Sequence, residues 1–347
     1  MRGIFHLLVF CLLVFSGLFV FRKHFQVGES LENQKKILRV FSYGSFTSSY
    51  GPGPQLKSEF EKKCDCIVEF IEGADAGILL QRLKIEGEGL GADVILGLDQ
   101  FDLSRAQREF SWKKLNVGSV SFHPRVKQAL AVPEFVPYDW GILSFVARSE
   151  LSDPPKKLDD LLSPVWRGRF ALQDPRTSSP GLQFVMWVLH EKGEKAGFDY
   201  LEKVLKNAHS VSGSWSQSYS LFQKRQVDLV FSYSTSVMYH LIEEKDPNYQ
   251  ALEFQERHPE QFEFMAIPQY CRECDLAQDF IRFMLEPESQ KILINKNYML
   301  PVIPDLLEFS ALKESPLFGT FSRSQLPSDF EVQKTLREWN KRRRGVE

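Results

Sequence analysis

Short β-rich runs alternate with helical patterns along this chain of 347 residues. Residues 37–43 alternate as a strand does, and Gly53-Pro54 then opens a helix with proline at its first position. A second strand at 66–71, a helix at 77–86 and a third strand at 92–98 follow. This βαβαβ order predicts a parallel sheet flanked by helices.

A second series of the same kind begins near Tyr138, and the chain is longer than a usual single domain. Its predicted elements are strands at 141–146, 169–173, 227–231 and 262–266 and helices at 181–191, 276–285 and 329–344. We therefore expect an α/β fold of two lobes joined by a hinge, each lobe a mostly parallel sheet flanked by helices. The expected divisions are residues 37–137 for lobe I, 138–264 for lobe II, and 265–347 for the completion of lobe I with the C-terminal helix.

The net charge of -2 gives the chain no general attraction to nucleic acid, whose binders usually carry a basic excess. The one dense basic run, 341–344, follows Val332, Leu336 and Trp339 at helical spacing. We interpret it as the cationic last turn of an amphipathic helix.

An apolar run extends from Ile4 to Phe21, with Arg2 before it and basic residues after it. Residues 1–26 are therefore an export signal or a short membrane anchor. Val14 and Ser16 could form a small-residue cleavage site, whereas the apolar residues beyond them favour an uncleaved membrane anchor. Both alternatives export the rest of the chain from the cytoplasm.

Four cysteines lie outside this segment, as Cys64-Asp65-Cys66 and Cys271-Arg272-Glu273-Cys274. An even number of cysteines after an export signal favours disulfides. Four thiolates could also bind zinc, which is the lesser alternative. The sequence does not give the pairing.

Ligands of open α/β sheets bind beyond the carboxyl ends of the strands, so the residues after each predicted strand are candidate contacts. In lobe I, the first strand is followed by a loop with Tyr43, Tyr50 and several hydroxyls, and the second by Asp75 at a helix start. Asp75 is either a ligand contact or a plain helix cap. Asp99, after the third strand, has the same two interpretations.

In lobe II, Ser178 and Ser179 bridge a strand to a helix, where they would suit a phosphate or alcohol oxygen or serve as a cap. Trp215 follows one strand, and the segment 233–239 with its two tyrosines follows the next. Rings that converge from both lobes would suit a delocalised or quaternary cation, which is attracted to aromatic faces.

Taken together, these segments resemble the thiamine-binding periplasmic proteins of bacterial thiamine ABC transporters. The resemblance covers roughly residues 37–303. It is carried by Ser45-Phe46, Tyr50-Gly51-Pro52-Gly53-Pro54, Cys64-Asp65-Cys66, Leu79-Leu80-Gln81-Arg82-Leu83, residues 92–99, Phe135-Val136-Pro137-Tyr138-Asp139, residues 173–182, Trp215-Ser216, Asp228-Leu229-Val230, Ser232-Tyr233 and Tyr239-His240.

The resemblance implies a type II periplasmic-binding fold without catalysis or cofactor. The protein would capture thiamine, its monophosphate or its diphosphate and deliver it, as a monomer, to an ABC permease in the inner membrane. The ligand-binding residues that it implies are Tyr43, Tyr50, Asp75, Ala76, Ser178, Ser179, Trp215, Tyr233, Ser234, Thr235, Ser236, Tyr239 and Tyr298.

This sequence also departs from the family pattern. Tyr50 and Tyr298 stand where the pattern suggests Trp, Ala76 replaces a Gly, and Gly44 replaces an Asp. Because Tyr is a weaker cation partner than Trp, these changes bear on affinity more than on ligand class.

Three rival functions stay open on the sequence alone. A polyamine binder of the same fold could use Asp75, Asp99 and Asp139, and an iron binder would use phenolates with carboxylates or His. A thiamine-degrading enzyme would need a nucleophilic Cys in the cleft, where no cysteine is expected. A purely structural envelope protein would bind no small molecule.

Overall fold

Strands and helices alternate along the chain in the computed structural model, which describes residues 35–127, 132–304, 306–307, 311–316, 318–320 and 328–344. The strands are β1 (Ile37–Tyr43), β2 (Ile67–Gly73), β3 (Val94–Asp99), β4 (Val136–Arg148), β5 (Phe170–Gln173), β6 (Ser210–Ser212), β7 (Leu229–Tyr233), β8 (Tyr249–Ala251), β9 (Glu260–Ala266) and β10 (Leu300–Pro301). The α-helices are α2 (Gly44–Thr47), α3 (Gly53–Cys64), α4 (Leu79–Glu86), α5 (Leu103–Glu109), α6 (Pro124–Lys127), α7 (Ser179–Lys192), α8 (Glu194–Asn207), α9 (Trp215–Gln223), α10 (Ser236–Tyr239), α11 (Cys274–Met284), α12 (Pro287–Asn297) and α13 (Asp329–Arg344). Short 3-10 or π turns are η1 (Ala76–Ile78), η2 (Gly87–Leu90), η3 (Leu158–Leu162), η4 (Pro164–Trp166), η5 (His240–Glu244) and η6 (Ala311–Glu314).

The first series forms the predicted parallel sheet. β1 pairs in parallel with β2 along its whole length and with β3 on its other side. The helix after β1 begins with Pro54 in its first turn and buries Leu56 and Phe60 against the sheet. The βαβαβ prediction is confirmed, and the carboxyl ends of β1, β2 and β3 lie at one edge of the sheet.

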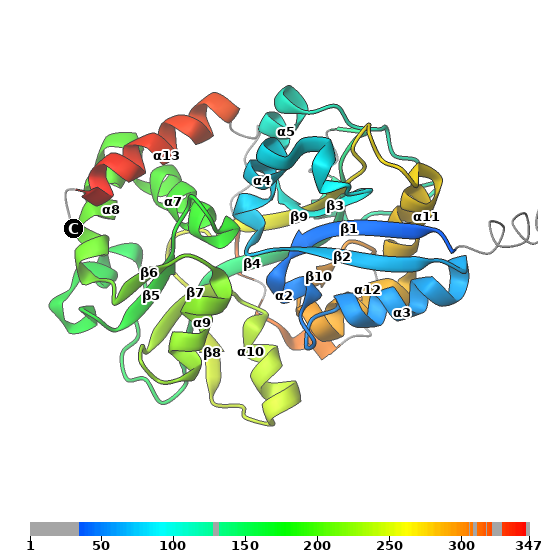
Figure 1. Ribbon diagram of the computed structural model, residues 1–347. Coiled ribbons are helices and arrows are strands. Elements are labelled where there is room, and N and C mark those ends of the chain that lie inside the picture. Colours follow the sequence, from blue (N-terminus) through cyan, green and yellow to red (C-terminus); the bar gives the residue numbers. More distant parts are fainter. Residues whose placement is uncertain are drawn as a thin grey trace, which may run out of the picture.

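Two antiparallel strands connect the two halves of the molecule (Figure 1). β9 pairs antiparallel with β3 and with the first half of β4, at residues 136–142. The second half of β4 pairs antiparallel with β7, which continues in parallel to β5 and β6. The strand order is β2-β1-β3-β9-β4-β7-β5-β6, so β4 passes from one half to the other.

Buried aromatic side chains form a separate core on each side of this connection. On one side Phe60 packs edge-on against Phe280, with ring centroids 5.1 Å apart. On the other side Phe145 contacts Phe231 at 5.4 Å. Phe60 and Phe280 fall in the ranges that we expect for lobe I, and Phe145 and Phe231 in the range for lobe II, so we keep those names as our interpretation. The lobe I core also includes Tyr138, Trp140 and Ile142 from the first half of β4.

The C-terminal helix α13 is placed differently from our expectation. We expected it to complete lobe I, but it packs on α8, in lobe II (Figure 1). Trp339 is 1% exposed and lies in the lobe II core with Phe198, because the apolar stripe of α13 matches the apolar side of α8. The first turn of α13 also contacts lobe I, where Asp329 pairs with Arg108 of α5.

The four cysteines of the described chain form two local disulfides. Cys64 bonds to Cys66 at the end of α3, and Cys271 bonds to Cys274 at the start of α11. The preference for disulfides over zinc is confirmed, and the pairing, which the sequence left open, is between near neighbours.

The expected export signal or anchor at residues 1–26 lies outside the described residues. Within the part of the chain that is described, no helix has the length and apolar character needed to cross a membrane.

Candidate functional site

A cleft of about 580 Å³ lies where the two lobes meet. Lobe I contributes residues that follow β1 and β2, and lobe II contributes residues at the start of α9 and after β7. The cleft therefore lies beyond the carboxyl ends of parallel strands, as expected for this fold class. Its volume is in the range of sites that hold small molecules.

Tyr43 forms part of the floor on the lobe I side. It is the last residue of β1, and its ring packs against Gly97 of β3, where φ is +111°. A Cβ atom at Gly97 would lie 2.5 Å from the Tyr43 ring, so only glycine leaves room for this ring. The Tyr43 hydroxyl donates to Glu263 Oε2 at 2.7 Å.

Stacked rings form the lobe II wall. Trp215, the first residue of α9, stacks on Tyr219 one turn later, with ring centroids 4.8 Å apart and planes 25° apart. Ser214 caps this helix by accepting a hydrogen bond from the backbone N–H of Gln217. The indole Nε1 of Trp215 donates to Ser232 Oγ at 2.9 Å, which fixes the orientation of the ring.

A third group of rings lies near the mouth of the cleft. Tyr239 and Tyr298 meet edge to face at 5.7 Å, and the Tyr298 hydroxyl donates to Glu243 Oε1 at 3.0 Å. Burial raises the pKa of Tyr298 above its usual range, so its hydroxyl stays protonated. Tyr50 also lines the cleft but is 66% exposed, so it contributes to the rim.

Asp75 connects the two lobes as well as lining the cleft. Its Oδ1 accepts from the backbone N–H of Ala76 at 2.7 Å, which is the helix cap that the sequence allowed. Its Oδ2 accepts from the backbone N–H of Trp215 at 2.8 Å, across the lobes. Burial raises the pKa of Asp75 to about 7, although both hydrogen bonds act to lower it.

Most of the predicted site residues line the cleft. Those that do are Tyr43, Tyr50, Asp75, Ala76, Ser179, Trp215, Tyr233, Ser236, Tyr239 and Tyr298. Ser178 lies instead in a smaller cavity beside α7 and α13. Ser234 and Thr235 are fully buried in the turn after β7, and their side-chain oxygens face protein and not the cleft.

The cleft also contains residues that we did not assign to it from the sequence: Ser45, Pro180, Ser216, Tyr219, Ser220, Gln223, Glu243, Gln261, Glu263, Lys296, Asn297 and Met299. Glu263 is the most unusual of these, because it is a carboxylate that is 4% exposed inside a strand. The sequence did contain a signal for it, because a charged residue between Phe262 and Phe264 in a predicted buried strand marks a candidate site residue.

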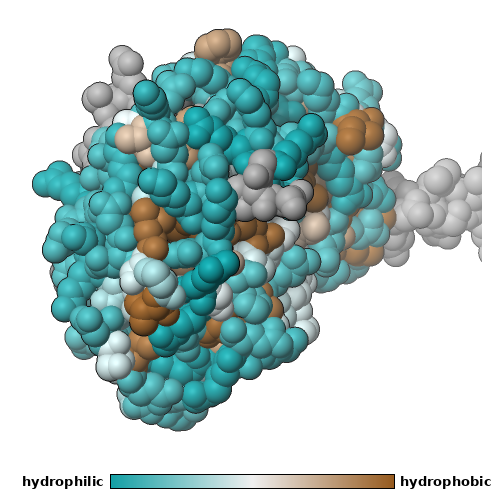
Figure 2. Space-filling model, turned by 90° about the vertical axis from the view of Figure 1, so that its left-hand side faces the viewer, coloured by the Kyte–Doolittle hydropathy of each residue, from teal (hydrophilic) through white to brown (hydrophobic). Residues whose placement is uncertain are grey.

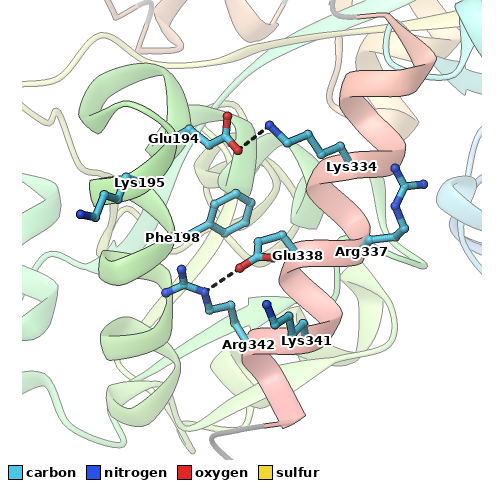
Figure 3. A pocket seen from close by; sticks show the side chains of 8 residues that line it. All are labelled: Glu194, Lys195, Phe198, Lys334, Arg337, Glu338, Lys341 and Arg342. Atoms are coloured by element: carbon cyan, nitrogen blue, oxygen red, sulfur yellow. Dashed lines mark hydrogen bonds and ion pairs between the residues drawn. The ribbon is translucent and has the colours of Figure 1, made fainter.

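A second cavity, of about 560 Å³, lies between α8 and α13 (Figure 3). Lysine and arginine side chains meet glutamates across it, and Lys334 pairs with Glu194 at 2.6 Å. The face that carries these helices is mostly hydrophilic, with a few hydrophobic residues near its centre (Figure 2). Because the residues that line it all lie on α8 and α13 and none at the end of a strand, we assign the ligand site to the cleft between the lobes.

No group of three or more His, Cys, Asp or Glu side chains that could hold a metal ion occurs among the described residues.

Comparisons with known proteins agree with this geometry. Residues 92–319 match the family model described as bacterial extracellular solute-binding protein. The thiamine-binding periplasmic protein of Salmonella typhimurium is 35% identical, over 88% of this chain and 93% of that protein. The protein of the same name from Escherichia coli is 38% identical, over 77% of this chain and 81% of its own.

This chain belongs to the family of thiamine-binding periplasmic proteins. A solved structure described as a periplasmic thiamin-binding protein superposes with a TM-score of 0.79 at 33% identity, covering 91% of this chain and 98% of that one. The type II periplasmic-binding fold expected from the sequence is therefore confirmed. A ferric binding protein from Campylobacter jejuni, at 18% identity and a TM-score of 0.71, shares the fold.

Proposed function

We propose that this protein captures thiamine or a thiamine phosphate in the cleft between its lobes. It works in the periplasm as a monomer without catalytic activity and passes the ligand to an ABC permease of the inner membrane. Proteins named for thiamine binding are 35% and 38% identical to this chain, which supports the ligand class.

The aromatic lining of the cleft is the observation that carries this proposal. Trp215 with Tyr219 on one side and Tyr43 on the other line the same cleft. Thiamine contains a positively charged thiazolium ring beside a neutral pyrimidine. A delocalised cation is attracted to a ring face by about 0.5 to 2 kcal/mol per contact.

Two cleft residues support binding of the phosphorylated forms. Ser179 is the first residue of α7, and its backbone lies at the positive end of a helix of 14 residues. Lys296 also lines the cleft and takes part in none of the ion pairs within the described chain. Each of these two features would attract a phosphate in the cleft.

The state of the cysteines supports binding without catalysis. A thiamine-degrading enzyme with a Cys nucleophile needs a thiolate in the cleft. Within the described chain all four cysteines are held in disulfides, and none of them lines the cleft.

A polyamine is the second candidate ligand, because three acidic residues line the cleft. Asp75, Glu243 and Glu263 come from different elements, so they could meet separated ammonium groups.

Isothermal titration of the purified protein tests the proposal. Thiamine, thiamine monophosphate, thiamine diphosphate, spermidine and ferric citrate are titrated separately. We expect saturable binding of at least one thiamine species and none of spermidine or ferric citrate. Heat from spermidine or ferric citrate, with none from the three thiamine species, would show that the ligand class is wrong.

A further inference from the structure

The Glu263 carboxylate lies at the floor of the cleft and accepts hydrogen bonds from four neutral donors. Oε2 accepts from the Tyr43 hydroxyl at 2.7 Å and from the Tyr138 hydroxyl at 2.5 Å. Oε1 accepts from Gln261 Nε2 at 3.0 Å. The Tyr233 hydroxyl lies 3.4 Å from Oε1, so residues of both lobes surround this one side chain.

No cationic side chain of the described protein neutralises this carboxylate. None of the ion pairs in that part of the chain includes Glu263, and its hydrogen-bond partners are uncharged. Lys296 lines the same cleft but is exposed and belongs to no ion pair there. A buried charge is costly unless an opposite charge pairs with it. A positive charge on a ligand in the cleft would therefore stabilise the Glu263 carboxylate.

A second buried carboxylate, Asp139, lies beside Glu263 on the neighbouring strand. Asp139 on β4 and Glu263 on β9 are cross-strand partners, so their side chains share one face. Asp139 Oδ2 accepts from Asn297 Nδ2 at 2.8 Å, while its Oδ1 has no hydrogen-bond partner. Asp139 is fully buried, and it does not line the cleft.

The two carboxylates differ in how well the protein stabilises their charge. Burial raises the pKa of Asp139 well above its usual range, and the nearby Glu263 charge raises it further. Burial also raises the pKa of Glu263, but the hydrogen bonds from Tyr138, Tyr43 and Gln261 oppose this effect. The hydrogen bonds therefore favour the charged form of Glu263 more than that of Asp139, which accepts a single hydrogen bond from Asn297.

We propose that the Glu263 carboxylate is the counter-charge for the positively charged ring of the ligand, and that it makes the cleft select a cation over a neutral molecule of the same shape. This inference rests on the proposed function, since it specifies how the same cleft recognises thiamine. The rings attract any delocalised cation, whereas Glu263 adds a full charge at a fixed point between the lobes. The tyrosine hydroxyls hold that charge in place without neutralising it.

The test compares thiamine with 3-deazathiamine, in which carbon replaces the charged ring nitrogen and leaves a neutral ring of nearly the same shape. Both ligands are titrated into the wild type, Glu263→Gln and Asp139→Asn. The Gln and Asn side chains keep the volume of the acids, and Asp139→Asn is the matched control because Asp139 is a neighbouring buried acid that does not line the cleft. Thermal unfolding of each variant checks that it is folded.

We expect the wild type to prefer thiamine by roughly a hundredfold, with the rings and Glu263 each contributing about tenfold. Glu263→Gln should lower this preference by about tenfold, and Asp139→Asn should leave it within about threefold of the wild type. An unchanged preference in Glu263→Gln would overturn the proposal. So would a loss of preference in Asp139→Asn, because the charge would then reside on Asp139.

Titration of the wild type alone separates a failure of the counter-charge inference from a failure of the proposed function. If it binds both ligands equally well, the counter-charge inference is wrong while thiamine binding stands. If it binds no thiamine species, the proposed function itself fails. Should Glu263→Gln not fold, a preference well above the roughly tenfold that the rings supply, in both the wild type and Asp139→Asn, supports the proposal. A preference of about tenfold or less in either one contradicts it.

Discussion

The Asp75 carboxylate accepts a hydrogen bond from the backbone N–H of Trp215, with 2.8 Å between Oδ2 and N. Asp75 follows β2 in lobe I, and Trp215 begins α9 in lobe II, so this bond joins the lobes at the edge of the cleft. Nearby, Gln81 Nε2 donates to the Arg176 carbonyl at 3.2 Å, again across the lobes. The residue that we expected to contact the ligand therefore also holds the two lobes together.

Burial of the Asp75 carboxylate between the lobes should make stability depend on pH. The pKa of Asp75 is about 7 in the folded protein against 3.8 for an unperturbed Asp, so its contribution to stability is full below about pH 4 and is lost as pH rises through 7. The free energy of unfolding of the wild type, minus that of Asp75→Asn, should fall by about 1 kcal/mol per pH unit between pH 4 and 7.

Urea unfolding of both proteins at several pH values measures this difference. Other buried acids titrate in both proteins, so the subtraction isolates Asp75. A flat difference, or one that grows with pH, would contradict the assignment.

Gly77 should be needed for the lobes to close. A Cβ atom at Gly77 would lie 2.6 Å from the carbonyl carbon and oxygen of Thr177 in lobe II. Overpacking of this kind costs about 1 to 3 kcal/mol, so Gly77→Ala should weaken thiamine binding by about tenfold or more. Gly89→Ala is the matched control, because a Cβ there meets no atom within 4 Å. Equal affinities in the two variants would show that this contact does not form on binding.

Removal of the Trp215 ring tests the aromatic wall. Trp215→Ala should weaken thiamine binding by about 1 to 3 kcal/mol, because the ring face toward the cation is lost. Phe330→Ala, on α13 and 68% exposed, removes an aromatic ring that does not line the cleft and should not change affinity. Titration calorimetry on both variants makes the comparison, and an unchanged affinity in Trp215→Ala would remove this residue from the site.

The order of elements was predictable from the sequence because local patterns determine it. The predicted strand at 37–43 and helix at 329–344 have the observed bounds of β1 and α13. The partner of α13 was not predictable, since the apolar stripe with Val332 and Trp339 shows that one face is buried but not against which lobe. That choice depends on the surface that α8 presents after folding.

The site was predictable where residues follow strands and not where they lie inside them. Tyr43, Asp75 and Trp215 come at strand ends or helix starts, which the sequence pattern locates. Glu263 lies within β9, and only the folded structure shows that it lines the cleft. Ser234 was expected in the site but is buried in the turn, because the turn geometry directs its side chain inward.

Reduction of the disulfides should have a small effect on stability and none on binding. The loop that each closes spans only two or three residue steps, from Cys64 to Cys66 and from Cys271 to Cys274. In the chain-entropy account such short loops stabilise the folded state by about 1 to 2 kcal/mol each at most. Urea unfolding and thiamine titration, with and without dithiothreitol, measure both quantities. Loss of thiamine binding on reduction would show that these bridges shape the cleft.

A crystal structure of the protein grown with thiamine tests the central claim most directly. We expect the vitamin in the cleft, with one ring against Trp215 and the thiazolium ring closer to Glu263 than to any other carboxylate. The Asp75 contact with the Trp215 backbone should be kept in that complex. Thiamine bound elsewhere, or a cleft that stays empty at saturating thiamine, would contradict the account.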